Sequence, residues 1–269
     1  MTVALSRIAA IALRQIYLLR GSPARILPLF AWVAIDILLW GFMTKYLNTI
    51  SSPRFSFIPA LLGAVLLWDF FARVMHGIAT AFFEDVWSRN FLNMFASPLS
   101  IGEYLAGLVL TSIATSAVGL TVMLLIATTA FGLSFAAYGL MLLPFFLILF
   151  LFGIALGVTG IAIVLRFGPA SEWFVWPIPA LLSPFVGVFY PLSTLPAWMQ
   201  AVSRLLPPSY VFEGMRAIVA GGRFSPMSLL WGGLLALFYI VLACWLFTRI
   251  YRQAVRSGLI ARYSAESVN

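Results

Sequence analysis

The chain has 269 residues, of which 63% are hydrophobic and only 9% are charged. An ordinary soluble domain carries about 25% charged residues, so this composition excludes most soluble folds, and it is too hydrophobic for intrinsic disorder. Long uncharged runs favour membrane-spanning helices over a β-barrel, whose strands alternate in polarity over about ten residues. Because one spanning helix needs about 20 apolar residues, the chain has room for about six or seven spans and little else.

The net charge is +8, and 15 of the 16 basic residues are arginines. In a membrane protein such an excess reflects topology and contact with anionic lipid rather than nucleic-acid binding. The single cysteine, Cys244, and the single histidine, His76, exclude a disulfide within the chain. They also exclude a metal site built from several Cys and His side chains.

The N-terminal segment is predicted to be an interfacial helix. Arg7 and Arg14 lie seven residues apart, and therefore on one face of a helix over residues 3–20 that is otherwise mostly apolar. This pattern is typical of an amphipathic helix on the membrane surface, and we assign residues 1–25 to it. The alternative is a simple leader into the first span. The two arginines also interrupt the first apolar stretch, which argues against a signal peptide.

The apolar runs predict a single all-α polytopic membrane domain over residues 1–269, with six transmembrane helices. The expected spans are 26–47, 57–80, 104–129, 138–165, 173–191 and 226–248. An even number of spans places both termini on one side. That side collects ten basic residues, the other side collects five, and Arg73 lies within a span. By the positive-inside rule, both termini are predicted to be cytoplasmic.

Three charged residues are expected deep within the first two spans: Asp36, Asp69 and Arg73. A helical rise of 1.5 Å per residue places Asp36 and Asp69 roughly 15 Å and 18 Å from the ends of their spans, near the middle of a ~30 Å hydrocarbon core. Arg73 follows Asp69 by four residues and shares its helix face. Because unpaired charges are costly there, we expect Arg73 to pair with one or both carboxylates. The cluster either braces the fold or contacts the cargo.

A polar segment follows the second span and is predicted to form a short amphipathic helix over residues 84–95. Its apolar side chains recur at helical spacing, acidic residues at its start suit the helix dipole, and Pro98 ends it. Such a helix on the cytosolic side either binds in the groove of a partner or lies on the bilayer surface. The candidate partner-binding residues are Glu84, Asp85, Trp87, Arg89 and Phe91.

Residues 192–225 are too apolar for a free loop, yet seven of the 15 prolines lie between residues 177 and 208, which forbids one continuous helix. We predict two short helices, about 196–206 and 208–220, that re-enter the outer leaflet. Ser209 is expected to cap the second helix, and Glu213 to pair with Arg216. The segment is interpreted as an outer gate, or alternatively as an interfacial aromatic anchor. The gate and pathway residues are Phe185, Phe189, Tyr190, Leu195, Trp198, Tyr210, Glu213 and Arg216.

Enzymatic motifs are absent from the sequence. The only lysine, Lys45, does not follow a glycine-rich loop, and neither a G-x-S-x-G nor an H-E-x-x-H motif occurs. We therefore expect a chain without catalytic activity and without a cofactor or metal of its own. Gly153 and Gly157 form a GxxxG motif in the fourth span, which permits close helix packing within the chain or between subunits.

The outer segment carries the pattern Phe-Tyr-Pro…Leu-Pro…Pro…Tyr…Glu-x-x-Arg, which begins at Phe189 and ends at Arg216. This pattern resembles the signature region of ABC-2-type transport permeases, the membrane subunits of a class of ABC exporters. The polar loop that ends at residues 97–100, Ser-Pro-Leu-Ser, resembles their coupling region. The six-span plan with cytoplasmic termini is also similar, so the resemblance covers nearly the whole chain.

The resemblance implies a half-transporter in the bacterial inner membrane. Two permease subunits would enclose a path, as a homodimer or alternatively as a heterodimer with a related permease. Two ATP-binding subunits that hold ATP and Mg would bind residues 84–95. The start of the chain, residues 14–23, does not resemble capsule and O-antigen exporters, so the implied branch is the drug- or lipid-exporting one. The implied cargo is hydrophobic or amphipathic: a drug, a lipid or a lipid-linked molecule. The alternatives are an ATP-independent secondary carrier or channel, and a non-transporting scaffold.

Overall fold

The computed structural model describes residues 3–50, 58–88, 94, 97–134, 139–222 and 225–257. All regular structure among these residues is helical, which confirms the all-α prediction. The α-helices are α1 (Val3–Arg20), α2 (Pro23–Ile50), α3 (Gly63–Trp87), α5 (Ile101–Phe131), α6 (Leu142–Phe167), α7 (Ile178–Val186), α8 (Ala197–Ser203), α9 (Pro207–Val219) and α10 (Pro226–Arg256). Short helical turns are η1 (Ile58–Leu62), η3 (Gly139–Met141), η4 (Pro169–Phe174) and η5 (Leu192–Thr194).

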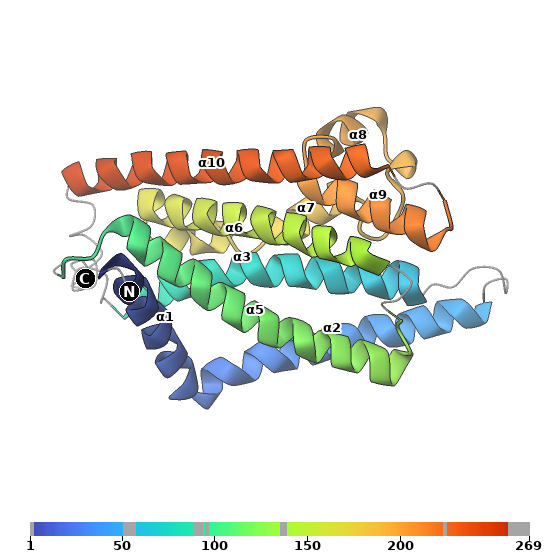
Figure 1. Cartoon of the computed structure of the whole chain (residues 1–269), viewed down its shortest axis with the longest axis horizontal. Coiled ribbons are helices and arrows are strands. Elements are labelled where there is room, and N and C mark those ends of the chain that lie inside the picture. Colours follow the sequence, from blue (N-terminus) through green and yellow to red (C-terminus); the bar gives the residue numbers. More distant parts are fainter. Residues whose placement is uncertain are drawn as a thin grey trace.

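Five helices within the described part of the chain are long and apolar enough to cross a membrane. They cover Phe30–Ile50, Ala60–Trp87, Ile101–Phe131, Gly139–Phe167 and Pro226–Arg256. These ranges coincide with five of the six predicted spans, and most of them extend further at one or both ends. The long helices lie side by side along the long axis of the molecule, as expected of a multi-pass membrane protein (Figure 1).

The predicted span over residues 173–191 is not one helix in the structure. Its only α-helix is α7, whose nine residues extend about 14 Å at 1.5 Å per residue, about half of a ~30 Å hydrocarbon core. Pro184 lies inside α7, and Gly187 ends it with φ of 69°, a left-handed conformation that favours glycine. The chain still returns through this segment from the end of α6 to the opposite end of the molecule, where α9 and α10 begin (Figure 1).

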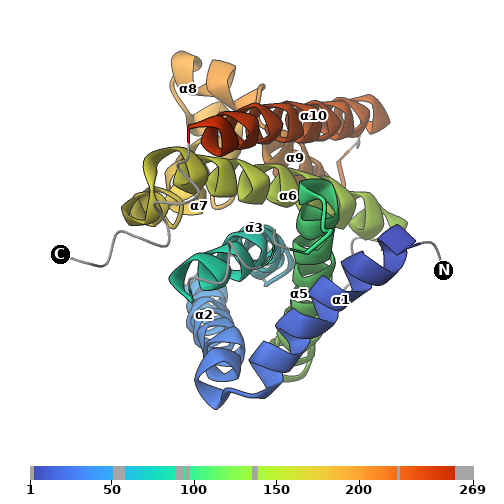
Figure 2. The ribbon, with the colours of Figure 1, turned by 90° about the vertical axis from the view of Figure 1, so that its left-hand side faces the viewer.

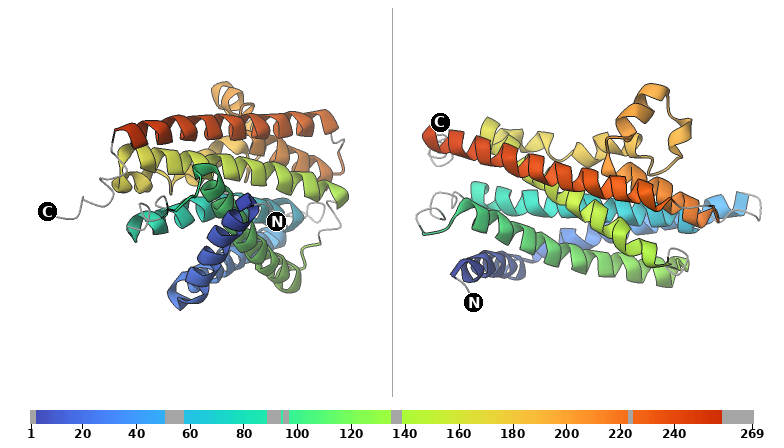
Figure 3. Two further views of the ribbon diagram at one scale, coloured as in Figure 1. Left: turned by 60° about the vertical axis from the view of Figure 1, so that its left-hand side comes forward. Right: turned by 45° about the horizontal axis from the view of Figure 1, so that its top comes forward.

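The helices form successive layers around α6. α10 packs on one side of α6 and α3 on the other, and α5 then packs against α3, α1 and α2 (Figure 3). A Cβ built on Gly153 or Gly157 would lie 3.0 Å from the side chain of Val74 or Ile78 on α3. The GxxxG motif therefore serves packing between α6 and α3 within this chain.

The N-terminal helix α1 crosses the bundle obliquely, at the same end as the C-terminal end of α10 (Figures 1 and 2). It ends at Arg20, and α2 begins at Pro23 after a short break. Ile11 and Ala12 are buried, and a Cβ on Gly107 of α5 would lie 2.5 Å from Ile11. The predicted N-terminal helix is therefore present and is attached to α5 by direct packing.

Candidate functional site

A cavity of about 580 Å³ lies among α1, α2, α3 and α5, with one wall from the turn before α7. These four helices surround the same region in the end-on view of Figure 2. Four charged side chains line it: Asp36, Asp69, Arg73 and Glu84. The other polar or aromatic lining residues are Gln15, Trp32, His76, Thr80, Thr111, Thr115 and Trp176. A cavity with this lining is unusual between apolar spanning helices, because charges inside a membrane are costly.

The structure brings together the three charged residues expected deep within the first two spans. Asp36 on α2 and Asp69 on α3 both line the cavity, and Arg73, one turn after Asp69, interacts electrostatically with both carboxylates. The Oδ2 atom of Asp69 is buried and has no hydrogen-bond donor among the described residues. All three side chains therefore face a space inside the bundle.

A glycine on α5 makes room for Arg73. A Cβ built on Gly119 would lie 2.7 Å from both Cδ and Nε of Arg73. Real Cβ atoms do not approach other atoms so closely, so a side chain at this position requires the arginine to move. Gly119 thus leaves room for the guanidinium against α5, where it interacts electrostatically with the two carboxylates.

A buried network joins α1, α3 and α5 at the end of the bundle where α1 lies. Arg14 forms an ion pair with Asp85, with 2.6 Å between Nη1 and Oδ1, and Tyr104 donates a hydrogen bond of 2.7 Å to Oδ2. Gln15 donates to the carbonyl of Ala81. The side chain of Asp85 is 0% exposed, so the ion pair holds the last turns of α3 against the N-terminal helix.

Asp85 was expected to contact an ATPase subunit; this contact stays a prediction, but the structure places the side chain in the interior of the chain. Its carboxylate is fully buried, and both oxygens already have partners on α1 and α5. The physical reason is that Glu84–Trp87 are the last turn of α3 rather than the start of a separate helix. The side chain of Asp85 therefore contacts α1 and α5, the helices that pack against this end of α3.

Of the other candidate partner-binding residues, Glu84 and Trp87 lie within the described part of the chain. Glu84 is partly exposed and lines the cavity. Trp87 is 52% exposed, and its indole N–H donates a hydrogen bond of 2.9 Å to Glu172 in η4. Arg89 and Phe91 lie outside the described residues. Among the candidate partner-binding residues that the structure describes, Trp87 is thus the most exposed to solvent.

The two short helices predicted for the outer segment are confirmed. They are α8 (Ala197–Ser203) and α9 (Pro207–Val219). Ser209 does not cap α9, because the helix already begins at Pro207, and Leu206 is its N-cap residue. The Ser209 hydroxyl instead donates to the carbonyl oxygens of Ser203 and Leu206, at 2.6 and 2.7 Å. Re-entry into the outer leaflet stays a prediction.

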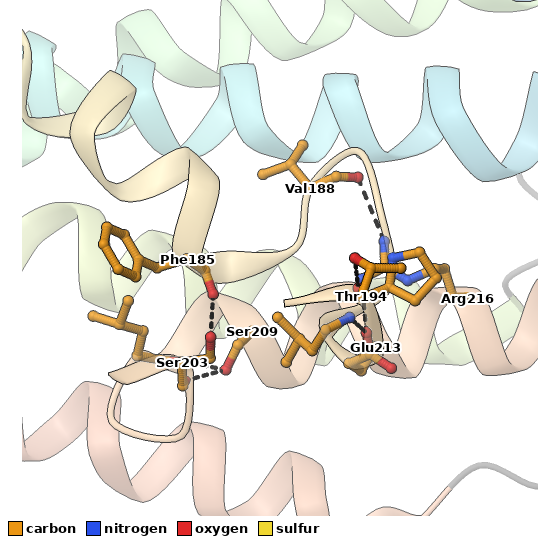
Figure 4. Close-up of polar contacts among 10 residues, drawn as sticks. Phe185, Val188, Thr194, Ser203, Ser209, Glu213 and Arg216 are labelled. Atoms are coloured by element: carbon orange, nitrogen blue, oxygen red, sulfur yellow. Dashed lines mark hydrogen bonds and ion pairs between the residues drawn. The ribbon is translucent and has the colours of Figure 1, made fainter. Parts of the chain in front are cut away.

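The predicted pair of Glu213 and Arg216 is confirmed, with 2.9 Å between Oε1 and Nη2 (Figure 4). The same Oε1 accepts a hydrogen bond of 2.9 Å from the backbone N–H of Leu192, and Nη1 of Arg216 donates to the carbonyl of Val188. The pair therefore holds the chain between α7 and η5 against α9. A Cβ on Gly187 would lie 2.9 Å from Nη2 of Arg216, so only glycine fits here without displacement.

Hydrogen bonds also join α7, α8 and α9 into one unit. The Ser203 hydroxyl on α8 donates to the carbonyl of Phe185 on α7, and Ser209 on α9 donates back to Ser203 (Figure 4). The other predicted gate residues lie in or beside this unit. The ring of Phe185 contacts that of Trp198, and the ring of Phe189 stacks on Trp40 of α2 with 4.8 Å between the centroids. The hydroxyl of Tyr190 donates to the carbonyl of Pro184, and that of Tyr210 donates to the carbonyl of Arg204. The carbonyl of Leu195 accepts a hydrogen bond from the side chain of Gln200.

Replacing Glu213 by Ala is expected to loosen this unit. The change removes the acceptor for both Arg216 and the Leu192 N–H, and because Glu213 is partly exposed the loss should be about 1–2 kcal/mol. Hydrogen exchange of residues 188–194 should then accelerate by about 5- to 30-fold. Glu213→Gln keeps an oxygen acceptor for Leu192 and should show a smaller effect. Equal exchange in the wild type and Glu213→Ala would contradict the bracing role.

One known protein family matches the chain over most of its length. The family described as ABC-2 type transporter matches residues 9–220. This range includes the cavity-lining residues, the network around Asp85 and the unit of α7, α8 and α9. Among curated proteins, none matches the chain.

Proposed function

The chain belongs to the ABC-2 type transporter family, and from that premise we propose that it is the transmembrane permease subunit of an ATP-driven exporter. Its cargo is hydrophobic or amphipathic: a drug, a lipid or a lipid-linked molecule, moved across the bacterial inner membrane. Two copies form a homodimer with both termini in the cytoplasm. Two ATP-binding subunits hold ATP and Mg, so the chain itself is not an enzyme and needs no cofactor.

The observation that carries this proposal is the polar cavity among the spanning helices. Its lining includes Asp69 and Glu84, both on α3, which at 1.5 Å per residue lie about 22 Å apart along the helix axis. Charged groups at membrane depth are expensive, and they commonly mark substrate pathways. A cargo in this cavity would contact the same helix whose last turn carries Trp87.

The network around Asp85 supports a mechanical link between the ATPases and the cavity. Because Arg14 and Tyr104 bind the carboxylate of Asp85, a displacement of the end of α3 is transmitted to α1 and α5. All three helices line the cavity. Closure of the ATP-binding subunits would therefore change the shape of the cavity, as alternating access requires. At the other end, α8 and α9 serve as the outer gate in this proposal.

Co-purification with the ATP-binding partner tests this function. The full chain is expressed with ATP-binding proteins encoded next to its gene, purified as a complex and placed in lipid vesicles. We expect a complex with two copies of each subunit whose ATP hydrolysis rises when cargo is added. A chain that binds no ATP-binding protein, or that transports with an ion gradient in the absence of ATP, would contradict the proposal.

Replacing Trp87 by Ala is expected to weaken binding of the ATP-binding subunit by about 30-fold or more, because an exposed tryptophan at such an interface commonly contributes about 2 kcal/mol or more. The measurement is the affinity of the purified chain for its partner. The matched control is Trp231→Ala, because Trp231 is similarly exposed but lies at the start of α10, at the opposite end of the molecule. If Trp87→Ala and Trp231→Ala bind the partner equally well, Trp87 is not a docking residue.

A further inference from the structure

The size of the polar cavity fits a small molecule. Its volume of about 580 Å³ lies within the range of roughly 300–1,000 Å³ that is typical of pockets for drug-sized ligands. Apolar and aromatic side chains form part of the wall, with Trp32 on α2 and Trp176 in the turn before α7. The cavity therefore offers both hydrophobic surface and charge to a ligand.

Carboxyl groups outnumber cationic side chains in the lining of the cavity. Deep in the bundle, Asp36 and Asp69 face one guanidinium, that of Arg73, and Glu84 adds a third carboxylate toward the end of α3. At low dielectric constant, charges interact much more strongly than in water. An excess of carboxylates in such a site favours a cationic ligand and disfavours an anionic one.

One carboxylate oxygen in the cavity lacks a hydrogen bond from the residues that the structure describes, so the positive charge of a ligand would stabilise it. Oδ2 of Asp69 is buried and has no hydrogen-bond donor among the described residues. The nearby hydroxyls of Thr111 and Thr115 donate to carbonyls of their own helix. His76 bonds through Nε2 to the carbonyl of Trp176. The described residues also include no group of three or more His, Cys, Asp or Glu that would hold a metal ion.

We propose that this cavity binds an amphipathic organic cation, whose positive centre lies against Asp69 and Asp36 and whose apolar groups contact Trp32 and Trp176. Tryptophan also attracts cations through the face of its ring, which adds to the attraction of the carboxylates. The inference rests on the proposed function for its biological meaning, since it makes the exported cargo a cation. The binding itself requires neither ATP nor a partner subunit.

Equilibrium binding of tetraphenylphosphonium to the full chain in lipid nanodiscs tests the inference. The radiolabelled cation is added without ATP and without ATP-binding subunits, and binding to empty nanodiscs is subtracted. We expect saturable binding that Asp69→Asn weakens by at least about tenfold. Glu103→Gln removes the same charge near the start of α5, outside the cavity, and Gln also suits its capping box, so it should bind like the wild type.

A neutral competitor separates charge recognition from simple apolar binding. Triphenylphosphine oxide has similar aromatic surface but no net charge, and it should displace the cation poorly. Equal displacement by the neutral compound, or unchanged affinity in a folded Asp69→Asn variant, would overturn the inference. Because no ATPase takes part, failure here would leave the proposed permease function untouched.

A second measurement does not depend on the acidic variants. Thr115→Cys in a Cys244→Ser background places a thiol in the cavity wall. Tetraphenylphosphonium should slow the reaction of this thiol with a maleimide by at least about fivefold at a saturating concentration. An unchanged labelling rate at a concentration that saturates binding would show that the cation binds elsewhere, and it would overturn the assignment to this cavity.

Discussion

Replacing Asp85 by Ala is expected to destabilise the folded chain by about 3 kcal/mol or more. The carboxylate is fully buried, and its loss leaves the partly buried guanidinium of Arg14 without its ion-pair partner and the Tyr104 hydroxyl without its acceptor. Removal of one member of a buried pair typically costs about 3–5 kcal/mol. The measurement is the midpoint of thermal unfolding in detergent, followed by the loss of the monodisperse peak in size-exclusion chromatography.

Two controls sharpen this experiment. The Arg7–Glu103 pair joins α1 to α5, two of the three helices of this network, but lies closer to the surface at 3.4 Å, so Glu103→Gln should cost much less stability than Asp85→Ala. The double variant Arg14→Met with Asp85→Leu should recover part of the loss, because no charge is then left unpaired. A double variant as unstable as the sum of the single ones would show that Arg14 and Asp85 do not interact.

Replacing Gly119 by Leu is expected to reduce cargo transport by about 100-fold while the chain still folds. Even a Cβ at this position would lie 2.7 Å from Cδ and Nε of Arg73, so a leucine side chain must displace the guanidinium that interacts with Asp36 and Asp69. A misplacement of about 1 Å in a functional site commonly costs about 100-fold in rate. The measurement is ATP-dependent cargo flux in reconstituted vesicles.

Gly102→Leu is the matched control, because Gly102 lies on the same helix and a Cβ there meets no atom within 4 Å. This variant should transport like the wild type. Transport by Gly119→Leu at the wild-type rate would show that the position of Arg73 does not matter for the cargo. The flux is divided by the amount of protein per vesicle, so that poor incorporation of Gly119→Leu is not mistaken for a transport defect.

The sequence predicted those parts of the fold that depend on local composition. Apolar runs predicted the five helices that are long enough to span a membrane, and proline positions predicted α8 and α9. The i,i+3 spacing predicted the pair of Glu213 and Arg216. Each of these features is fixed by residues close together in the chain. Four prolines, Pro177, Pro179, Pro184 and Pro191, also lie within residues 173–191, but the length of the apolar run led to the expectation of a full span there.

The features that could not be predicted depend on contacts between distant residues. Asp85 looked like a surface residue because its partner Arg14 lies on a helix far away in the sequence. The hydrogen bond between Trp87 and Glu172 likewise joins α3 to η4. Asp36 and Asp69 were placed at membrane depth by counting residues, but the cavity around them, and the role of Gly119, require the packed positions of α2, α3 and α5.

The most direct test is ATP-dependent accumulation of a fluorescent amphipathic cation, rhodamine 6G, in inside-out vesicles that contain the chain and its ATP-binding partner. We expect uptake that requires ATP hydrolysis, persists when ionophores collapse all ion gradients, and falls by about tenfold or more in Asp69→Asn but not in Glu103→Gln. Uptake that continues without ATP and stops when the ion gradients are collapsed would identify a secondary carrier and contradict the assignment of this chain as the permease of an ATP-driven exporter.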